Sequence, residues 1–131
     1  MEHGTASVEV TDKDGQTMLH WAAQKNKLDI VKWLVEHEKA HIEATDKYGN
    51  TVLHLAAQEN KWDVVQWLVE NGNANVDAID DHRHTVLYWV AEENKRDVVQ
   101  WLVECRKANV EATDIGGKTP LNLAEEQKHK K

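Results

Sequence analysis

Threonines recur at a constant interval along this chain, and no other feature of the sequence constrains the fold as strongly. The interval is 34 residues, and the threonines concerned are Thr17, Thr51, Thr85 and Thr119. The same step relates a set of aspartates and tryptophans, namely Asp12, Asp46, Asp80, Asp114, Trp33, Trp67 and Trp101. Self-similarity at such a period indicates copies of one small structural unit, each burying its apolar face against a neighbour. We therefore expect a single repeat domain over 1–131, with complete repeats at 17–50, 51–84 and 85–118 and partial repeats at 6–16 and 119–131.

Each complete repeat has the pattern of two helices followed by a turn-rich segment. In the first copy, Thr17 is suited to the N-cap of a short helix, and Asn26 to the left-handed residue that ends it. Asp29 then stands near the start of a second amphipathic helix. Both helices should be about ten residues long, and the rest of the repeat, such as 42–49, is strand-like and rich in turn residues. Tetratricopeptide repeats have the same period but use two longer helices with almost no turn, so this pattern argues against them.

The stretches that begin at the four threonines share a further pattern. They read T-M-L-H-W-A-A, T-V-L-H-L-A-A, T-V-L-Y-W-V-A and T-P-L-N-L-A. These stretches resemble the Thr-Pro-Leu-His-x-Ala signature of ankyrin repeats. An Asp-x-x-Gly-x-Thr hairpin precedes three of them, at Asp12, Asp46 and Asp114, as in that family. The resemblance covers nearly the whole chain and implies an α fold, an ankyrin-repeat solenoid of paired short antiparallel helices joined by β-hairpin-like loops.

Some positions depart from the family pattern. Arg83 stands where the other hairpins have glycine, and Tyr88 and Asn122 replace the signature histidine. One extra residue follows each second helix, around 37–39, 71–73 and 105–107. The glycines in the other copies suggest a left-handed backbone, which costs a residue with a side chain about 1–2 kcal/mol. These departures alter loop geometry locally and leave the predicted fold unchanged.

The resemblance also implies a binding surface made of the hairpin tips and the first helices on one concave face. Carried over by position, the tip residues are Lys13, Asp14, Gln16, Lys47, Tyr48, Asn50, Asp81, His82, His84, Ile115, Gly116 and Lys118. The helix residues are Gln24, Lys25, Gln58, Glu59, Glu92, Glu93, Glu126 and Gln127. The copies differ most at these positions, whereas the apolar helix positions hardly change. A partner protein would explain this variation, and free drift of exposed positions is the alternative.

Charge and cysteine content narrow the class of partner and the compartment. The net charge of −7 opposes nucleic-acid binding, which relies on clustered Lys and Arg. The apolar stretches are too short for a membrane-spanning segment, and the N-terminal residues lack the pattern of a secretory signal. The lone Cys105 and the absence of an Asn-x-Ser/Thr acceptor favour an intracellular compartment, cytoplasmic or nuclear. We expect a monomer that binds another protein and uses no cofactor.

One segment matches a catalytic motif. His37-Glu38-x-x-His41 has the H-E-x-x-H spacing that, on a helix, places two zinc ligands on one face with a general base between them. That chemistry needs an unbroken helix and a third ligand. The aligned copies have Asn71 and Gly72 here, where a helix is ending. We therefore expect neither a zinc site nor catalysis.

The remaining histidines and the tryptophans are expected to serve the structure. His20 and His54 stand where the family has a structural histidine that bonds to a neighbouring turn, and His82 and His84 should be solvated. The tryptophans at repeated helix positions should be partly buried by packing. Trp62 should be half exposed, since one of its counterparts is an arginine.

Three functional hypotheses follow. The first is a protein–protein interaction module. The second is a stable repeat scaffold, natural or engineered, without a dedicated ligand. The third is a zinc hydrolase acting through His37, Glu38 and His41. Metal analysis separates the third from the others, and a partner search separates the first two.

Overall fold

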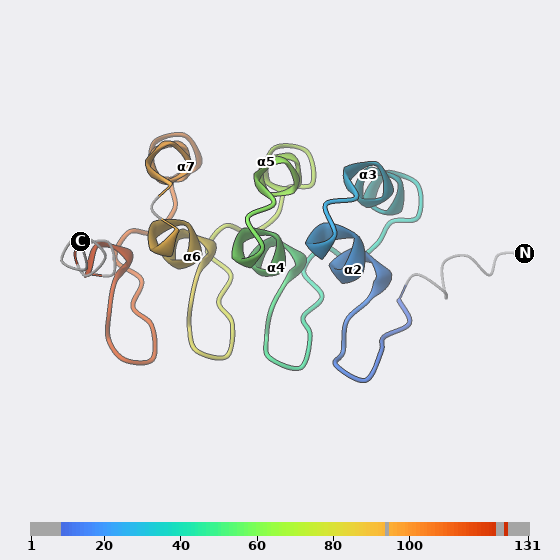
Figure 1. Ribbon diagram of the computed structural model, residues 1–131, viewed down its shortest axis with the longest axis horizontal. Coiled ribbons are helices and arrows are strands. Elements are labelled where there is room, and N and C mark those ends of the chain that lie inside the picture. Colours follow the sequence, from blue (N-terminus) through green and yellow to red (C-terminus); the bar gives the residue numbers. More distant parts are fainter. Residues whose placement is uncertain (1–8, 94, 123–124, 126–131) are drawn as a thin grey trace, which may run out of the picture. The chain divides into compact units, whose positions relative to one another are not determined.

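Paired short helices dominate the computed structural model, which describes residues 9–93, 95–122 and 125 (Figure 1). The helices are α2 (Met18–Gln24), α3 (Leu28–Glu36), α4 (Val52–Gln58), α5 (Trp62–Glu70), α6 (Val86–Glu92), α7 (Arg96–Gln100) and the π-helical turn η1 (Trp101–Cys105), which continues α7. No β-strand forms within these described residues, and the last third of each repeat consists of turns. The predicted α fold is therefore confirmed, while the strand-like segments form hairpin-shaped loops.

Reciprocal capping fixes the start of the first helix in two repeats. Thr17 Oγ1 accepts from the His20 N–H, and His20 Nδ1 accepts from the Thr17 N–H at 3.0 Å. The same pair of bonds joins Thr51 to His54. Each pair satisfies two backbone groups that a helix start leaves without helical partners. The threonine spacing therefore marks helix starts, as predicted.

In the third repeat the cap is simpler. Thr85 Oγ1 still accepts from the Tyr88 N–H at 3.4 Å, but no reciprocal bond returns to Thr85. A phenol ring has no counterpart of the histidine Nδ1 that accepts this bond in the other repeats. The replacement of histidine by Tyr88 thus removes half of the capping arrangement.

Left-handed asparagines end the first helices. The φ angles are 60° at Asn26 and 62° at Asn60, as the sequence predicts. The third counterpart, Asn94, lies outside the described residues. The first helices have seven residues each, fewer than the predicted ten or so, because the threonine cap and the asparagine enclose so short a segment.

The second helices close with one repeated turn. Lys39, Asn73 and Lys107 have φ angles of 55°, 58° and 58°. The following alanine N–H then donates to a leucine carbonyl six residues earlier, and the pairs are Ala40 to Leu34, Ala74 to Leu68 and Ala108 to Leu102, each at 3.0 Å. Such bonds satisfy carbonyl groups at a helix end. The extra residue after each second helix therefore belongs to the same closing turn in all three repeats.

The chain divides into two compact units, residues 1–75 and residues 76–131, here called unit 1 and unit 2. In unit 1, α2 packs against α3 and α4, and α4 packs against α5. Its core includes Leu19, Ala22, Val31, Leu34, Leu53, Ala56, Val64 and Leu68. In unit 2, α6 packs against α7, and the core includes Leu87, Val90 and Leu102. Burying an aliphatic side chain of this size stabilises a fold by about 1.5–3 kcal/mol, so these apolar positions hold each unit together.

His20 ties the first helix of repeat 17–50 to the hairpin that ends the same repeat. Its side chain is fully buried, and Nε2 lies 3.2 Å from the carbonyl oxygen of Asn50. Because Nδ1 accepts from Thr17, the proton sits on Nε2 and the ring is neutral. Burial lowers the pKa of His20, against the opposing effects of the bond to Asn50 and the charge of Asp46. The structural role predicted for this histidine is confirmed.

Candidate functional site

A carboxylate organises each hairpin tip. Asp46 Oδ1 accepts from the N–H groups of Tyr48 and Asn50, both at 2.9 Å. Equivalent bonds are made by Asp12, Asp80 and Asp114 to the residues two and four positions on. In each unit the hairpins project from the helix pairs (Figure 1). The tips therefore share one backbone design, whatever side chains they carry.

The same backbone conformation recurs at the residue before the last in each tip. Gly15, Gly49 and Gly117 have φ angles of 78°, 81° and 82°. Arg83 occupies the equivalent position with a φ of 65°. The left-handed backbone predicted for Arg83 is confirmed, so this arginine adopts a conformation that favours glycine.

Two contacts join neighbouring tips in unit 1. The Lys47 N–H donates to the Asp14 carbonyl at 2.9 Å, and Lys47 Nζ lies 3.0 Å from Asp14 Oδ1. The side-chain bond to Asp14 is the largest cause of a raised pKa at Lys47. The same ammonium lies 5.2 Å from the ring centre of Tyr48, whose side chain is 55% exposed. Tyr48 is thus an exposed aromatic side chain on a tip that is fixed on two sides.

Amide side chains of the hairpins and first helices hold these tips in place through hydrogen bonds. Gln16 Nε2 donates to Asp46 Oδ2 at 3.3 Å, and Gln24 Nε2 donates to Gln16 Oε1 at 3.0 Å. Gln58 Nε2 likewise donates to Asn50 Oδ1 at 3.0 Å. Asn50 is buried, whereas Lys13, Lys25 and Glu59 are exposed. Of the residues predicted to contact a partner, the amides therefore position the loops, while the charged residues and Tyr48 provide the accessible surface.

Unit 2 presents a different set of side chains on the same loop design. The Ile115 N–H donates to the His82 carbonyl at 2.9 Å, which joins its two described tips. Ile115 is 71% exposed, and the other exposed residues of the predicted surface are Asp81, His82, Glu92, Glu93, Gly116 and Lys118. Glu126 and Gln127, also predicted to contribute, lie outside the described residues.

His84 does not lie where the sequence suggested. Only 16% of its side chain is exposed, and its ring stacks on Tyr88 with centres 3.8 Å apart and planes 15° apart. The ring of Trp89 meets it edge-on, with centres 5.1 Å apart. The expectation of a solvated residue is therefore wrong for His84 and holds for His82. The signal that could have located it is the unusual pair of aromatic residues at Tyr88 and Trp89, just after the cap.

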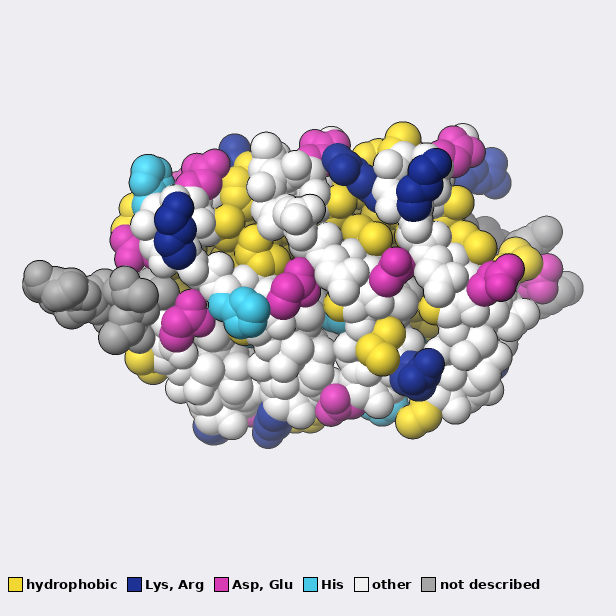
Figure 2. Space-filling view, turned by 180° about the vertical axis from the view of Figure 1, so that it is seen from behind, with side chains coloured by type: hydrophobic (Ala, Val, Ile, Leu, Met, Phe, Trp, Pro, Cys, Tyr) yellow, Lys and Arg dark blue, Asp and Glu magenta, His cyan; other side chains and the backbone are white. Residues whose placement is uncertain are grey.

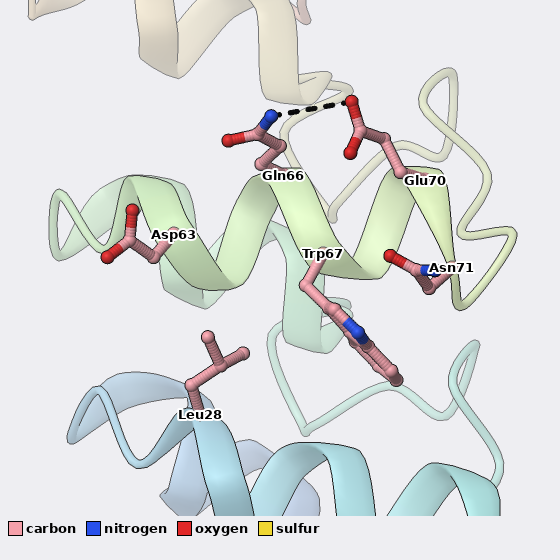
Figure 3. A pocket seen from close by; sticks show the side chains of 6 residues that line it. All are labelled: Leu28, Asp63, Gln66, Trp67, Glu70 and Asn71. Carbon is pink, nitrogen blue, oxygen red and sulfur yellow. Dashed lines mark hydrogen bonds between the residues drawn. The ribbon is translucent and has the colours of Figure 1, made fainter.

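The second helices of unit 1 enclose a shallow groove between α3 and α5. It has a volume of about 210 Å³ and is lined by Leu28, Asp63, Gln66, Trp67, Glu70 and Asn71. The Trp67 ring projects toward α3, and Gln66 Nε2 donates to Glu70 Oε2 at 3.4 Å (Figure 3). Apolar side chains are visible between these upper helices in Figure 2, with charged side chains on the outer surfaces. Asp63 and Glu70 place two carboxylates beside Trp67 in this groove.

The tryptophans at repeated positions differ in exposure. Trp33 is 49% exposed, whereas Trp67 and Trp101 are half-buried. Trp21 is 46% exposed, although Leu55 at the same repeat position is buried. Trp62 is half-buried, as predicted.

The residues of the zinc motif do not share a helix. His37 is the C-cap of α3, and Lys39 is left-handed, so the chain turns between His37 and His41. The His41 N–H donates to Glu9 Oε2 at 3.2 Å in a loop. Within the part of the chain that the structure describes, no three His, Cys, Asp or Glu side chains lie close enough to hold a metal ion.

Comparison with known families agrees with this architecture. A family model described as ankyrin repeats (3 copies) matches residues 3–80, and a single ankyrin-repeat model matches residues 82–115. A search of curated proteins gave no match. Among the described residues, no helix combines the length and apolar character needed to cross a bilayer. Since the matched segments cover most of the sequence and the capped helix pairs recur within it, the chain belongs to the ankyrin-repeat family.

Proposed function

We propose that this chain binds another protein through its hairpin tips and the ends of its first helices. Ankyrin repeats are generally protein–protein interaction modules, which supports a protein as the partner. The accessible candidates are Lys13, Asp14, Lys25, Lys47, Tyr48, Glu59, Asp81, His82, Glu92, Glu93, Ile115 and Lys118. Gln16, Gln24, Asn50, Gln58 and His84 position the loops that carry them.

One observation carries the proposal, namely that identical tip backbones present unlike side chains. The carboxylate bonds and the left-handed residue recur in every tip, so the fold needs only those. The exposed positions between them nevertheless change from Lys47 and Tyr48 to Asp81 and His82, and then to Ile115. Variation at accessible positions on a constant support is what a binding surface requires.

The rigidity of the tips favours tight contact. Association carries an entropic cost for every side chain and loop that must become ordered on binding. Tyr48 is held on a loop with fixed backbone bonds, and Lys47 is already paired with Asp14. Such a residue offers apolar contact area at little entropic cost, so we assign Tyr48 the central role in unit 1.

Charge suggests the character of the partner. The exposed candidates of unit 1 include Lys13 and Lys25, whereas those of unit 2 include Asp81, Glu92 and Glu93. Complementary charge on a partner would speed encounter and fix its orientation. We propose a protein partner and no nucleic acid, because the net charge of −7 repels phosphates.

We propose a non-enzymatic monomer that uses no cofactor and resides in the cytoplasm or nucleus. Cys105 is exposed and unpaired, which suits a reducing compartment. The repeat boundaries remain those inferred from the threonine spacing, with complete repeats over 17–50, 51–84 and 85–118.

Affinity capture with matched variants tests the proposal. The full chain, a tip variant carrying Tyr48→Ala with His82→Ala, and a control carrying Trp62→Ala with Arg96→Ala on the second helices would each be immobilised in a cell lysate. We expect a protein that the wild type and the control retain and the tip variant releases. Urea unfolding of all three chains verifies that each is folded.

Two outcomes would contradict the proposal. A protein retained by the tip variant and released by the control would move the working surface to the second helices. If no protein distinguishes the variants at any concentration tested, the alternative of a repeat scaffold without a dedicated ligand replaces the proposed function.

A further inference from the structure

His84 lies between two carboxylates in unit 2. Its Nδ1 is 3.5 Å from Asp80 Oδ2 in the same hairpin, and its Nε2 is 3.6 Å from Asp114 Oδ2 in the following hairpin. The side chains of Asp80 and Asp114 are 5% and 10% exposed, so water screens these contacts only weakly. A neutral imidazole carries one ring proton and can donate to one carboxylate, whereas a protonated imidazole can donate to both. Only a protonated ring can therefore donate to both carboxylates at once.

In unit 1 the equivalent contact between neighbouring hairpins uses an amide donor, which does not respond to pH. Gln16 occupies the repeat position of His84, and its Nε2 donates to Asp46 Oδ2 of the next hairpin at 3.3 Å. An amide donates at every pH at which the protein folds. Hairpin 80–84 thus has a titratable donor where hairpin 12–16 has a permanent one.

Backbone hydrogen bonding keeps the Asp114 carboxylate charged, and α6 covers the other side of His84. The Lys118 N–H bond is the largest cause of a lowered pKa at Asp114, which keeps that carboxylate charged where imidazoles titrate. From α6, the rings of Tyr88 and Trp89 cover His84, and Glu92 stands at the helix position from which Gln24 and Gln58 reach their hairpins.

The other titratable or charged groups lie on the two hairpins. His82 is stacked 5.7 Å from His84, and Arg83 adjoins it in the chain. Asp81 and Lys118 are exposed. The exposed charges are screened by solvent, so the two buried carboxylates dominate.

We propose that His84 is a pH-dependent clip that joins hairpin 80–84 to hairpin 114–118 and tightens on acidification. The backbone bond from Ile115 to His82 already joins these hairpins at 2.9 Å, and the clip adds a side-chain bridge beside it. The clip fixes the spacing of the exposed His82 and Ile115 in acid, independently of any partner.

Amide hydrogen exchange on the full chain tests the clip. The protection factor of the Ile115 N–H, corrected for the intrinsic effect of pH, would be measured by NMR at about pH 8 and pH 5.5 in the wild type and in His84→Gln. We expect protection in the wild type to rise about tenfold or more relative to His84→Gln on acidification, the order for one hydrogen bond with a charged group. Asp114→Asn, which retains Oδ1 as an acceptor for its own tip, should abolish most of that rise. His82→Gln should retain it, because His82 is exposed and the two carboxylate contacts are made by His84.

An equal pH response of Ile115 in the wild type and in His84→Gln would overturn the proposal. If His84→Gln does not fold, the ¹⁵N signals of the His84 ring in the wild type decide the matter. Slowly exchanging protons on both ring nitrogens at pH 5.5 support the clip, and a proton on only one nitrogen at that pH contradicts it.

Discussion

His20 Nε2 lies 3.2 Å from the backbone carbonyl of Asn50 and ties the first helix of one repeat to the hairpin that precedes the next. The ring is fully buried, and its other nitrogen accepts from Thr17. One side chain thus caps its own helix and holds the hairpin that ends the repeat, so the stability of the fold depends on its protonation state.

The first prediction is a pH-dependent contribution of His20. Burial lowers the pKa of His20 in the folded chain, so the unfolded chain binds the proton more readily. The contribution of His20 should be fully present above its ordinary pKa of about 6.5 and should be lost as pH falls below that value. Urea unfolding at about pH 7.5 and pH 5 should show a smaller acid loss in His20→Asn than in the wild type. An acid loss of equal size in both chains would contradict the neutral, buried ring. This effect has the opposite sign to that of the His84 clip, so only variant-by-variant comparison separates them.

Arg83→Gly should stabilise the protein. Arg83 has a φ of 65° at a position where the other tips have glycine, and a side chain in this region costs about 1–2 kcal/mol. Chemical denaturation should show a gain of up to about 1 kcal/mol, because glycine also adds freedom to the unfolded chain. Arg83→Ala is the control, since it removes the guanidinium without relieving the backbone and should bring no comparable gain. A glycine variant that is equal to or weaker than the wild type would contradict the argument.

His41→Ala should leave the free energy of unfolding within about 0.5 kcal/mol of the wild type. The side chain is exposed, and the bond to Glu9 uses the backbone N–H, which alanine retains. Metal analysis after dialysis should find no stoichiometric zinc in either chain. Zinc that the wild type retains and this variant loses would restore the hydrolase hypothesis.

Tyr48→Ala should weaken the partner identified by capture by about 2 kcal/mol or more, as truncation of an interface hot spot does. Tyr48 is 55% exposed and contributes no buried contact to the core, so stability should change little. Calorimetric titration measures the loss, with Trp62→Ala as a matched aromatic truncation on the second helices. Equal losses in the two variants would remove Tyr48 from its proposed role.

Charge reversal of Glu92 and Glu93 should mainly alter the association rate and its dependence on salt. Both residues are exposed, so they act on the partner through the solvent-screened field. Stopped-flow association across a salt series is the measurement. A change confined to the dissociation rate would indicate direct buried contacts instead.

The sequence by itself determined where the first helices begin and which residues cap and end them. Thr17, Thr51 and Thr85 were recognisable as N-caps, and Asn26 and Asn60 as helix-ending residues, because capping depends on groups only a few residues apart. The left-handed backbone at Arg83 also followed from comparison with the glycines of the other copies. The helix end between His37 and His41 could also be foreseen, since the aligned copies place a helix end there.

Only the tertiary structure decided which of the variable positions are accessible. Asn50 and Tyr48 lie on the same tip, yet Asn50 is buried against Asp46 and Gln58 while Tyr48 is exposed. Trp21 and Leu55 share a repeat position, yet Trp21 is exposed and Leu55 is buried. His84 acquires its two carboxylates from its own hairpin and from one thirty residues away in sequence. Repetition specifies local geometry, but burial and charge pairing depend on which side chains the adjoining repeat supplies, and those vary from copy to copy.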